Sequence, residues 1–159
     1  MELYHGGRLP DHQTFWPLSH FGTKKAALDR IKVNYEDHVP WVPEKNFLYK
    51  CSVDIGSKVV DLADWHAAVP SGIILALSKA GILEVGQRDL SQILQPINDI
   101  QQDRPEEALR MVLGSIEHLG ISTLRYPNQH EGRVGEFSYC VVNPSTVRVI
   151  EYCKIEHND

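Results

Sequence analysis

The chain has 159 residues, of which 42% are hydrophobic and 23% charged, and its formal net charge is −5. This composition is typical of one soluble globular domain with its own core, and the negative charge argues against a general nucleic-acid surface. Three cysteines without close pairing, Cys51, Cys140 and Cys153, favour reduced thiols and a cytoplasmic protein. No apolar run approaches the roughly 18 residues of a membrane span, and we expect no signal peptide. An effector delivered into a target cell by a dedicated secretion system would have the same features.

The first half of the chain predicts short strands around one amphipathic helix. Thr23 is suited to cap this helix, in which Ala27, Leu28 and Ile31 recur at helical spacing. From Phe47 onward apolar and polar residues alternate, as in a half-buried strand. The expected elements are a strand at 3–4, a loop at 8–17, a strand end at 18–22, a helix at 24–35, an irregular segment at 36–45, and strands at 47–55 and 59–62.

The second half predicts helices followed by strands. An apolar helix is expected at 72–80, and Asp89 is expected to cap a second helix that Pro96 interrupts. Asp103 is expected to cap a third helix, with Glu106 reaching back to complete the cap. After residue 120 the period changes to two, which predicts strands at 121–126, 137–142 and 147–152. The order of elements indicates an α+β domain with a largely antiparallel sheet and a helical insertion at about 66–120.

Two strand ends near the N-terminus carry candidate binding residues. In the first, His5 precedes Gly6 and Gly7, and glycines leave bare backbone on which a ligand can lie. The His5 ring beside that surface can donate or accept a hydrogen bond. The second, residues 19–23, has a ring pair, a glycine and the helix-capping threonine. Two such strand ends predict a site for a flat molecule rich in hydroxyl groups.

A third motif lies in residues 126–144, where Asn128, Glu131 and Gly132 are followed by Ser138-Tyr139 and an apolar strand. Together with Tyr4-His5-Gly6, Phe21-Gly22-Thr23 and Ala26-Ala27, this block resembles the bacterial mono-ADP-ribosyltransferases of the toxin or effector type. The resemblance covers about the first 30 and the last 35 residues. It implies that residues 1–159 form a single domain with a split antiparallel β-sheet, in which a His-Gly strand and an aromatic strand hold NAD.

The resemblance also assigns roles to individual residues. Glu131 matches the catalytic glutamate of the Asn-x-x-Glu-Gly portion. Other branches of the family carry this glutamate at the start of the next strand, beside the tyrosine that matches Tyr139; that place holds Ser138 here, and Glu136, two residues earlier, is the competing candidate. His5 would bond ribose hydroxyls, and the Gly6 backbone would pair with the nicotinamide amide. The residues expected to contact NAD are Tyr4, His5, Gly6, Ser19, His20, Phe21, Gly22, Thr23, Tyr35 and Ser138.

The chain departs from the family at His20, where many members have a tyrosine. Either Tyr35 or Tyr126 is a candidate for the missing aromatic ring. One of His20 and Phe21 should face the ligand and the other the core, because adjacent strand residues point to opposite faces. Arg8 and Arg133 are candidates for contact with the pyrophosphate. The scattered histidines lack zinc-ligand spacing and no dinucleotide glycine fingerprint is present, so we expect no metal and no Rossmann unit.

The expected reaction breaks the nicotinamide–ribose bond through an oxocarbenium-like state, which a fixed carboxylate stabilises. The leading hypothesis is transfer of ADP-ribose from NAD to a macromolecular acceptor, with a protein favoured over nucleic acid. Water as the acceptor would make the chain an NAD glycohydrolase, and loss of turnover would leave an NAD-binding module. The helical middle is a candidate surface for a cognate immunity protein or a host protein. An unrelated α+β protein whose motifs match by chance is the remaining alternative.

Overall fold

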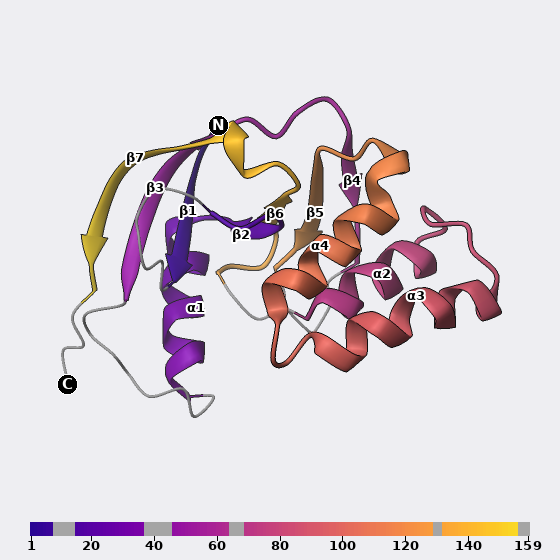
Figure 1. The fold of residues 1–159 in the computed structure, drawn as a ribbon. Coiled ribbons are helices and arrows are strands. Elements are labelled where there is room, and N and C mark those ends of the chain that lie inside the picture. Colours follow the sequence, from indigo (N-terminus) through magenta and orange to yellow (C-terminus); the bar gives the residue numbers. More distant parts are fainter. Residues whose placement is uncertain (8–14, 37–45, 64–68, 129–131, 156–159) are drawn as a thin grey trace.

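The computed structural model describes residues 1–7, 15–36, 46–63, 69–128 and 132–155, which form an α+β fold (Figure 1). The elements in chain order are β1 (Glu2–Gly7), β2 (Ser19–Phe21), α1 (Lys24–Glu36), β3 (Phe47–Val53), β4 (Val59–Asp61), α2 (Pro70–Lys79), α3 (Gln87–Ile100), α4 (Pro105–Ile116), β5 (Thr123–Pro127), β6 (Phe137–Val141) and β7 (Val147–Lys154). The strands end within two residues of their expected bounds, except that β1 continues through His5 to Gly7.

The described strands form two sheets, with the orders β1-β3-β7 and β2-β6-β5-β4. All pairs are antiparallel except β4 and β5, which run parallel, so the expectation of a largely antiparallel sheet is correct with one exception. Parallel neighbours need a crossover connection, and the segment containing α2, α3 and α4 supplies it. Figure 1 shows these three helices together on one side of β4 and β5.

Two apolar clusters lie on opposite faces of the β2-β6-β5-β4 sheet. One joins this sheet to α2, α3 and α4 and includes Leu124 and Cys140. The other lies between the two sheets and includes Phe21, Cys51 and Val141. Cys140 and Val141 are neighbours in β6, so the alternation of strand side chains serves both clusters. Cys51 and Cys140 are buried, as expected.

The helical part differs from the sequence prediction at the starts of α3 and α4 and at Pro96. α3 starts after Gly86 rather than at a cap formed by Asp89, and it continues through Pro96. Pro96 is exposed while Ile97 is 1% exposed, so burial of the apolar face outweighs the hydrogen bond that proline removes. The N-cap of α4 is Arg104, not Asp103, and no side chain caps it.

The other expected partner in the α4 cap also behaves differently. Glu106 forms an ion pair with Arg110, farther along the helix, instead of reaching back to the cap.

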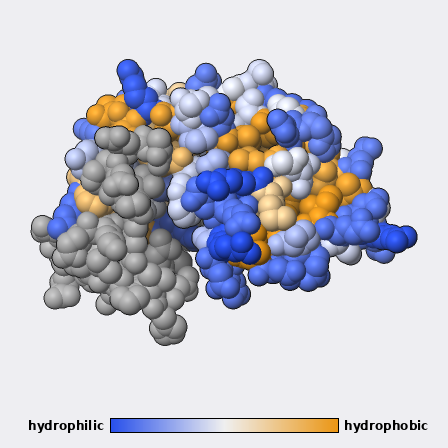
Figure 2. Space-filling view, viewed as in Figure 1, coloured by the Kyte–Doolittle hydropathy of each residue, from blue (hydrophilic) through white to orange (hydrophobic). Residues whose placement is uncertain are grey.

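Apolar side chains remain visible on the surface over the helices in Figure 2. Val69 and Leu75, at and within α2, are among the exposed large hydrophobic residues.

Candidate functional site

Strands β1 and β2 meet at a single residue pair and then diverge. Tyr4 and Gly22 exchange backbone hydrogen bonds of 2.8 and 2.9 Å. Backbone groups alternate between the two edges of a strand, so the N–H and C=O of Gly6 point to the same edge as those of Tyr4. Gly6 therefore presents a backbone donor and acceptor on the side of β2, beyond the Tyr4–Gly22 pair. We call this place, where β1 and β2 separate after Tyr4 and Gly22, the β1–β2 split. Tyr4 and His5 project from opposite faces of β1, so the ring of Tyr4 is not on the side of the imidazole.

The imidazole of His5 reaches across the β1–β2 split. Its Nδ1 lies 2.8 Å from the carbonyl oxygen of His20, and a carbonyl can only accept, so Nδ1 carries the proton. Burial lowers the pKa of His5, and the positive charge of Arg30 lowers it further, against the opposing effect of the bond to His20. His5 is therefore a neutral imidazole whose Nε2 is a hydrogen-bond acceptor. The rings of Phe15 and Phe21 pack around it, with centroids at 5.1 and 5.6 Å.

The two glycines after His5 make room for protein atoms. A Cβ on Gly6 would lie 2.1 Å from the carbonyl oxygen of Ala27, because α1 packs directly on that face of β1. A Cβ on Gly7 would lie 2.8 Å from Nε2 of His5. The Cα face of Gly6 is thus covered by α1, and the prediction that it stays bare for a ligand is wrong. The sequence does not show which helix covers which strand face.

The side chains of His20 and Phe21 point to opposite faces of β2, as those of adjacent strand residues do. Phe21 is 1% exposed and belongs to the cluster between the sheets, on the same face of β2 as Ser19. His20 faces the other side, where its Nδ1 bonds the hydroxyl of Tyr126, with ring centroids 5.6 Å apart at an angle of 74°. Burial lowers the pKa of His20 to about 3. Phe21 is a core residue, and the described aromatic ring beside His20 is that of Tyr126.

Glu136 lies at the N-terminus of α1. Its Oε2 accepts hydrogen bonds from Oγ1 of Thr23 at 2.7 Å and from the backbone N of Arg133 at 3.0 Å. Both bonds lower the pKa of Glu136, and the bond from Thr23 has the larger effect. The same Thr23 oxygen accepts from the backbone N of Ala26 at 3.2 Å, so the predicted helix cap is confirmed. Glu136 is an ionised carboxylate at the positive end of a helix, and its Oε1 makes no hydrogen bond to the described residues.

Buried polar contacts tie the connection between β5 and β6 to its surroundings. Oγ of Ser138 donates to Oδ1 of Asn128 at 2.7 Å, and the backbone N of Asn128 donates to the carbonyl of Glu136 at 2.9 Å. The backbone N of Gly132 donates to Oδ2 of Asp29 on α1 at 2.9 Å. Ser138 is 4% exposed, so its hydroxyl supports Asn128 rather than lining an open surface. Among buried side-chain atoms in the described residues, only Nδ2 of Asn128 lacks a hydrogen-bond partner.

Three segments distant in sequence therefore converge: the end of β1, the β2–α1 junction and the start of β6. The candidates form two contacting pairs, His5 with His20 and Thr23 with Glu136, and the backbone pair of Tyr4 and Gly22 joins the residues just before His5 and Thr23. Three candidates lie outside what the structure describes: Glu131, Arg8 and the side chain of Tyr35. The sequence interpretation missed Arg30, whose charge lowers the pKa of both His5 and His20. Its spacing of four and three residues from Ala26 and Ala27 was the available signal.

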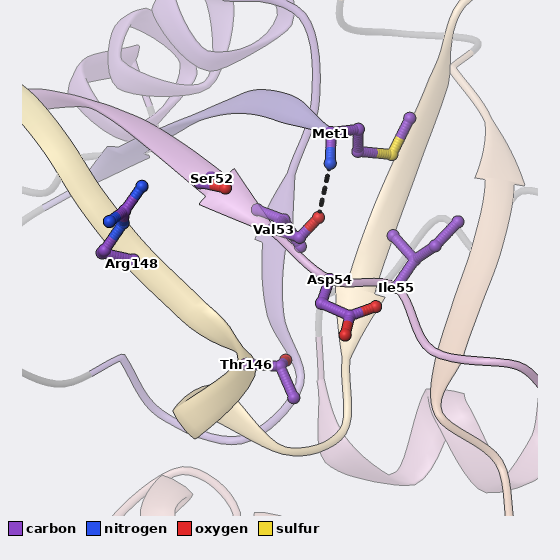
Figure 3. A pocket seen from close by; sticks show the side chains of 7 residues that line it. All are labelled: Met1, Ser52, Val53, Asp54, Ile55, Thr146 and Arg148. Atoms are coloured by element: carbon purple, nitrogen blue, oxygen red, sulfur yellow. Dashed lines mark hydrogen bonds between the residues drawn. The ribbon is translucent and has the colours of Figure 1, made fainter.

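A cavity of about 480 Å³ lies at the opposite end of β1 (Figure 3). The N-terminal amino group of Met1 donates to the carbonyl of Val53 at 2.7 Å beside it. None of the residues that line this cavity is a predicted site residue. They are Met1, Ser52, Val53, Asp54, Ile55, Thr146 and Arg148.

No family model, curated protein or solved structure matches the chain. Across the described parts of the chain, none of the helices is long and apolar enough to cross a membrane.

Proposed function

We propose that this protein transfers ADP-ribose from NAD to a macromolecular acceptor and releases nicotinamide. The observation that carries the proposal is the convergence of His5, the β2–α1 junction and Glu136 around the β1–β2 split. The two-sheet arrangement, with helices inserted between β4 and β5, is compatible with the ADP-ribosyltransferase-like core that the sequence resemblance implies.

The neutral His5 suits the recognition of a sugar. Its proton is on Nδ1, held by the carbonyl of His20, so Nε2 accepts a hydrogen bond from a ribose hydroxyl. The backbone N–H and C=O of Gly6 offer one donor and one acceptor at the same edge. A carboxamide carries the complementary acceptor and donor, so the nicotinamide amide pairs with Gly6. His20 and Tyr126 supply the aromatic surface on the other side of β2.

The chemistry requires a carboxylate near the ribose. When the glycosidic C–N bond breaks, its electron pair goes to the nicotinamide nitrogen, and nicotinamide leaves as a neutral ring without a general acid. Positive charge then grows on the ribose, and a fixed negative charge stabilises it. The lowered pKa of Glu136 keeps it ionised and makes it a weak base, so we assign it charge stabilisation rather than proton removal. Glu131 remains the alternative that the resemblance favours.

The test uses NAD labelled in its adenylate portion, incubated with the intact protein and a cell lysate. We expect the wild type to release nicotinamide and to label a macromolecule. Replacing the catalytic glutamate by glutamine should lower the rate about 100-fold or more, and Glu136→Gln and Glu131→Gln identify which residue it is. Glu117→Gln, an exposed residue after α4, is the control and should behave as wild type.

The proposal fails if the wild type releases no nicotinamide and labels nothing. It also fails if both glutamine variants match the wild type. Binding is checked separately by thermal shift, because NAD at one hundred times its Kd should stabilise the fold by about 2.7 kcal/mol.

Two alternatives use the same site. Free ADP-ribose as the product, with no labelled macromolecule, would identify an NAD glycohydrolase. The engagement of the His20 ring by the hydroxyl of Tyr126 favours an NAD-binding module without turnover, since that ring is already held by the protein. Calorimetry that shows NAD binding without any nicotinamide release would support the binding module.

A further inference from the structure

The cavity at the far end of β1 is lined by polar residues from two adjacent chain segments (Figure 3). Ser52 on β3 lies directly opposite Arg148 on β7, and the side chains of such an antiparallel pair project from the same face of the sheet. Asp54 follows Ser52 by two residues, and its backbone N donates to the carbonyl oxygen of Thr146 at 3.1 Å. The two segments therefore stay adjacent beyond the end of β3, and the polar residues form two successive rows.

The row of Ser52 and Arg148 supplies hydrogen-bond donors and a positive charge. A guanidinium only donates, and a serine hydroxyl can donate. Neither side chain makes a hydrogen bond or an ion pair with another residue in the described part of the chain. Glu2 lies opposite Ser52 on β1, but its carboxylate pairs with Lys50 at 3.4 Å. The charge of Arg148 is therefore not neutralised by this neighbour.

The row of Asp54 and Thr146 supplies acceptors and a negative charge. Oδ1 of Asp54 accepts a hydrogen bond from the backbone N of Gly56 at 2.9 Å, which fixes the carboxylate. Its Oδ2 accepts no hydrogen bond from the described residues. Oγ1 of Thr146 donates its proton to the carbonyl oxygen of Asn143 at 2.8 Å, so toward any other group this oxygen is an acceptor.

The opposite charges of Asp54 and Arg148 face the same cavity without meeting. They belong to different rows, and no ion pair joins them among the residues that the structure describes. The third charged group of the lining, the amino group of Met1, is bonded to the carbonyl oxygen of Val53 at 2.7 Å. A cavity of about 480 Å³ thus has a donor row with a positive charge next to an acceptor row with a negative charge.

We propose that this cavity binds a small zwitterion that carries one ammonium and one carboxylate group. The carboxylate lies at Ser52 and Arg148, and the ammonium lies at Asp54 and Thr146. Rows that are two residues apart along an antiparallel strand are separated by about 7 Å. The ligand is therefore an amino acid whose two charges are several carbon atoms apart. The cavity and the β1–β2 split are at opposite ends of β1, so this inference does not depend on the proposed function.

Titrations of the intact chain, followed by backbone amide chemical shifts, test the inference. The probes are glycine, 4-aminobutyrate and 6-aminohexanoate, in which the separation of the two charges increases. We expect 6-aminohexanoate to bind about 10-fold more tightly than glycine and to shift the amides of residues 52–55 and 146–148. Hexanoate and hexylamine each keep one of the two charges, and each should bind about 10-fold or more weaker than 6-aminohexanoate.

Two variants separate the two ends of the ligand. Asp54→Asn removes the negative charge but keeps an oxygen for the backbone N of Gly56, so it should weaken 6-aminohexanoate about 10-fold and leave hexanoate unchanged. Arg148→Gln should weaken 6-aminohexanoate by a similar factor and leave hexylamine unchanged. Arg88→Gln removes an exposed arginine from α3 and should bind every probe as wild type.

Three results on the wild type overturn the inference. Binding of hexanoate or hexylamine as tight as that of 6-aminohexanoate would mean that one of the two charged contacts is absent. Tighter binding of glycine than of 6-aminohexanoate would contradict the spacing of the rows. Failure of all three amino acids to produce a saturable shift at residues 52–55 and 146–148 would show that the cavity does not bind a zwitterion. These comparisons need no substitution, so they decide the inference even where thermal melting shows that a variant does not fold.

Discussion

Replacing Gly6 by alanine tests how closely α1 docks on β1. A Cβ at this position would lie 2.1 Å from the carbonyl oxygen of Ala27 and 2.9 Å from Cγ1 of Ile31. The oxygen belongs to the helix backbone, so it cannot turn away as a flexible side chain can. To restore an ordinary contact of 3.4 Å, α1 has to retreat by about 1.3 Å, the difference between that distance and 2.1 Å.

The energetic cost follows from overpacking a well-packed contact, which typically amounts to 1–3 kcal/mol, so we expect about 2 kcal/mol. For a domain of this size that corresponds to a drop in Tm of about 4–8 °C. Because Thr23 caps α1 and bonds Glu136, the same displacement should weaken NAD binding. If this face of Gly6 were open to a ligand, as the sequence predicts, the alanine would cause no loss of stability.

Thermal and urea unfolding followed by circular dichroism measure the effect. Gly114→Ala is a matched control, since nothing lies within 4 Å of its added Cβ and the residue is inside α4. It should stabilise the protein by about 0.5–1 kcal/mol. A Gly6→Ala protein that melts at or above the wild-type temperature would refute the close docking of α1 on β1.

Three further predictions concern the site and the thiols. Thr23→Val keeps the shape of the side chain but removes Oγ1. We expect the missing helix cap to lower the free energy of unfolding by about 1 kcal/mol and the lost hydrogen bond to raise the pKa of Glu136. Thr23→Ser keeps the hydroxyl and should stay close to wild type. Equal melting of the two variants would contradict the cap. His20 has a pKa of about 3 in the folded protein, against an ordinary value of 6.5. Between these two pH values the unfolded chain binds a proton at His20 that the folded protein does not. The stability that neutral His20 contributes is therefore complete above pH 6.5 and falls as the pH drops toward 3. The free energy of unfolding obtained from urea titrations should therefore decrease between pH 6.5 and 4.5, by at most about 1.4 kcal/mol per pH unit for this one group. His20→Asn should flatten this dependence, and an unchanged slope would place the titration elsewhere. Cys153 is exposed and should be the one cysteine to react quickly with a thiol reagent in the native protein, the other two reacting only in denaturant; fast reaction of a second thiol would contradict their burial.

Local patterns in the sequence were sufficient for most of the secondary structure. Alternation of apolar residues identified β3, β6 and β7, and the threonine before an apolar 3.6-residue repeat identified the start of α1. These features depend on neighbours in the chain, which is why they can be read without the fold. Four of the candidate site residues, His5, His20, Thr23 and Glu136, belong to short motifs, and Glu136 was named through the family resemblance that these motifs carry.

The tertiary structure decided what depends on contacts between distant segments. The parallel pairing of β4 with β5 depends on the crossover through the three helices. The continuation of α3 through Pro96 follows from the burial of Ile97 in the cluster that joins the helices to the sheet. The burial of Phe21 between the sheets and the docking of α1 on Gly6 depend on which elements pack together. The same holds for the effect of the Arg30 charge on the pKa of His5 and His20. A sequence states what each residue can do locally; packing selects which face, which neighbour and which charge it meets.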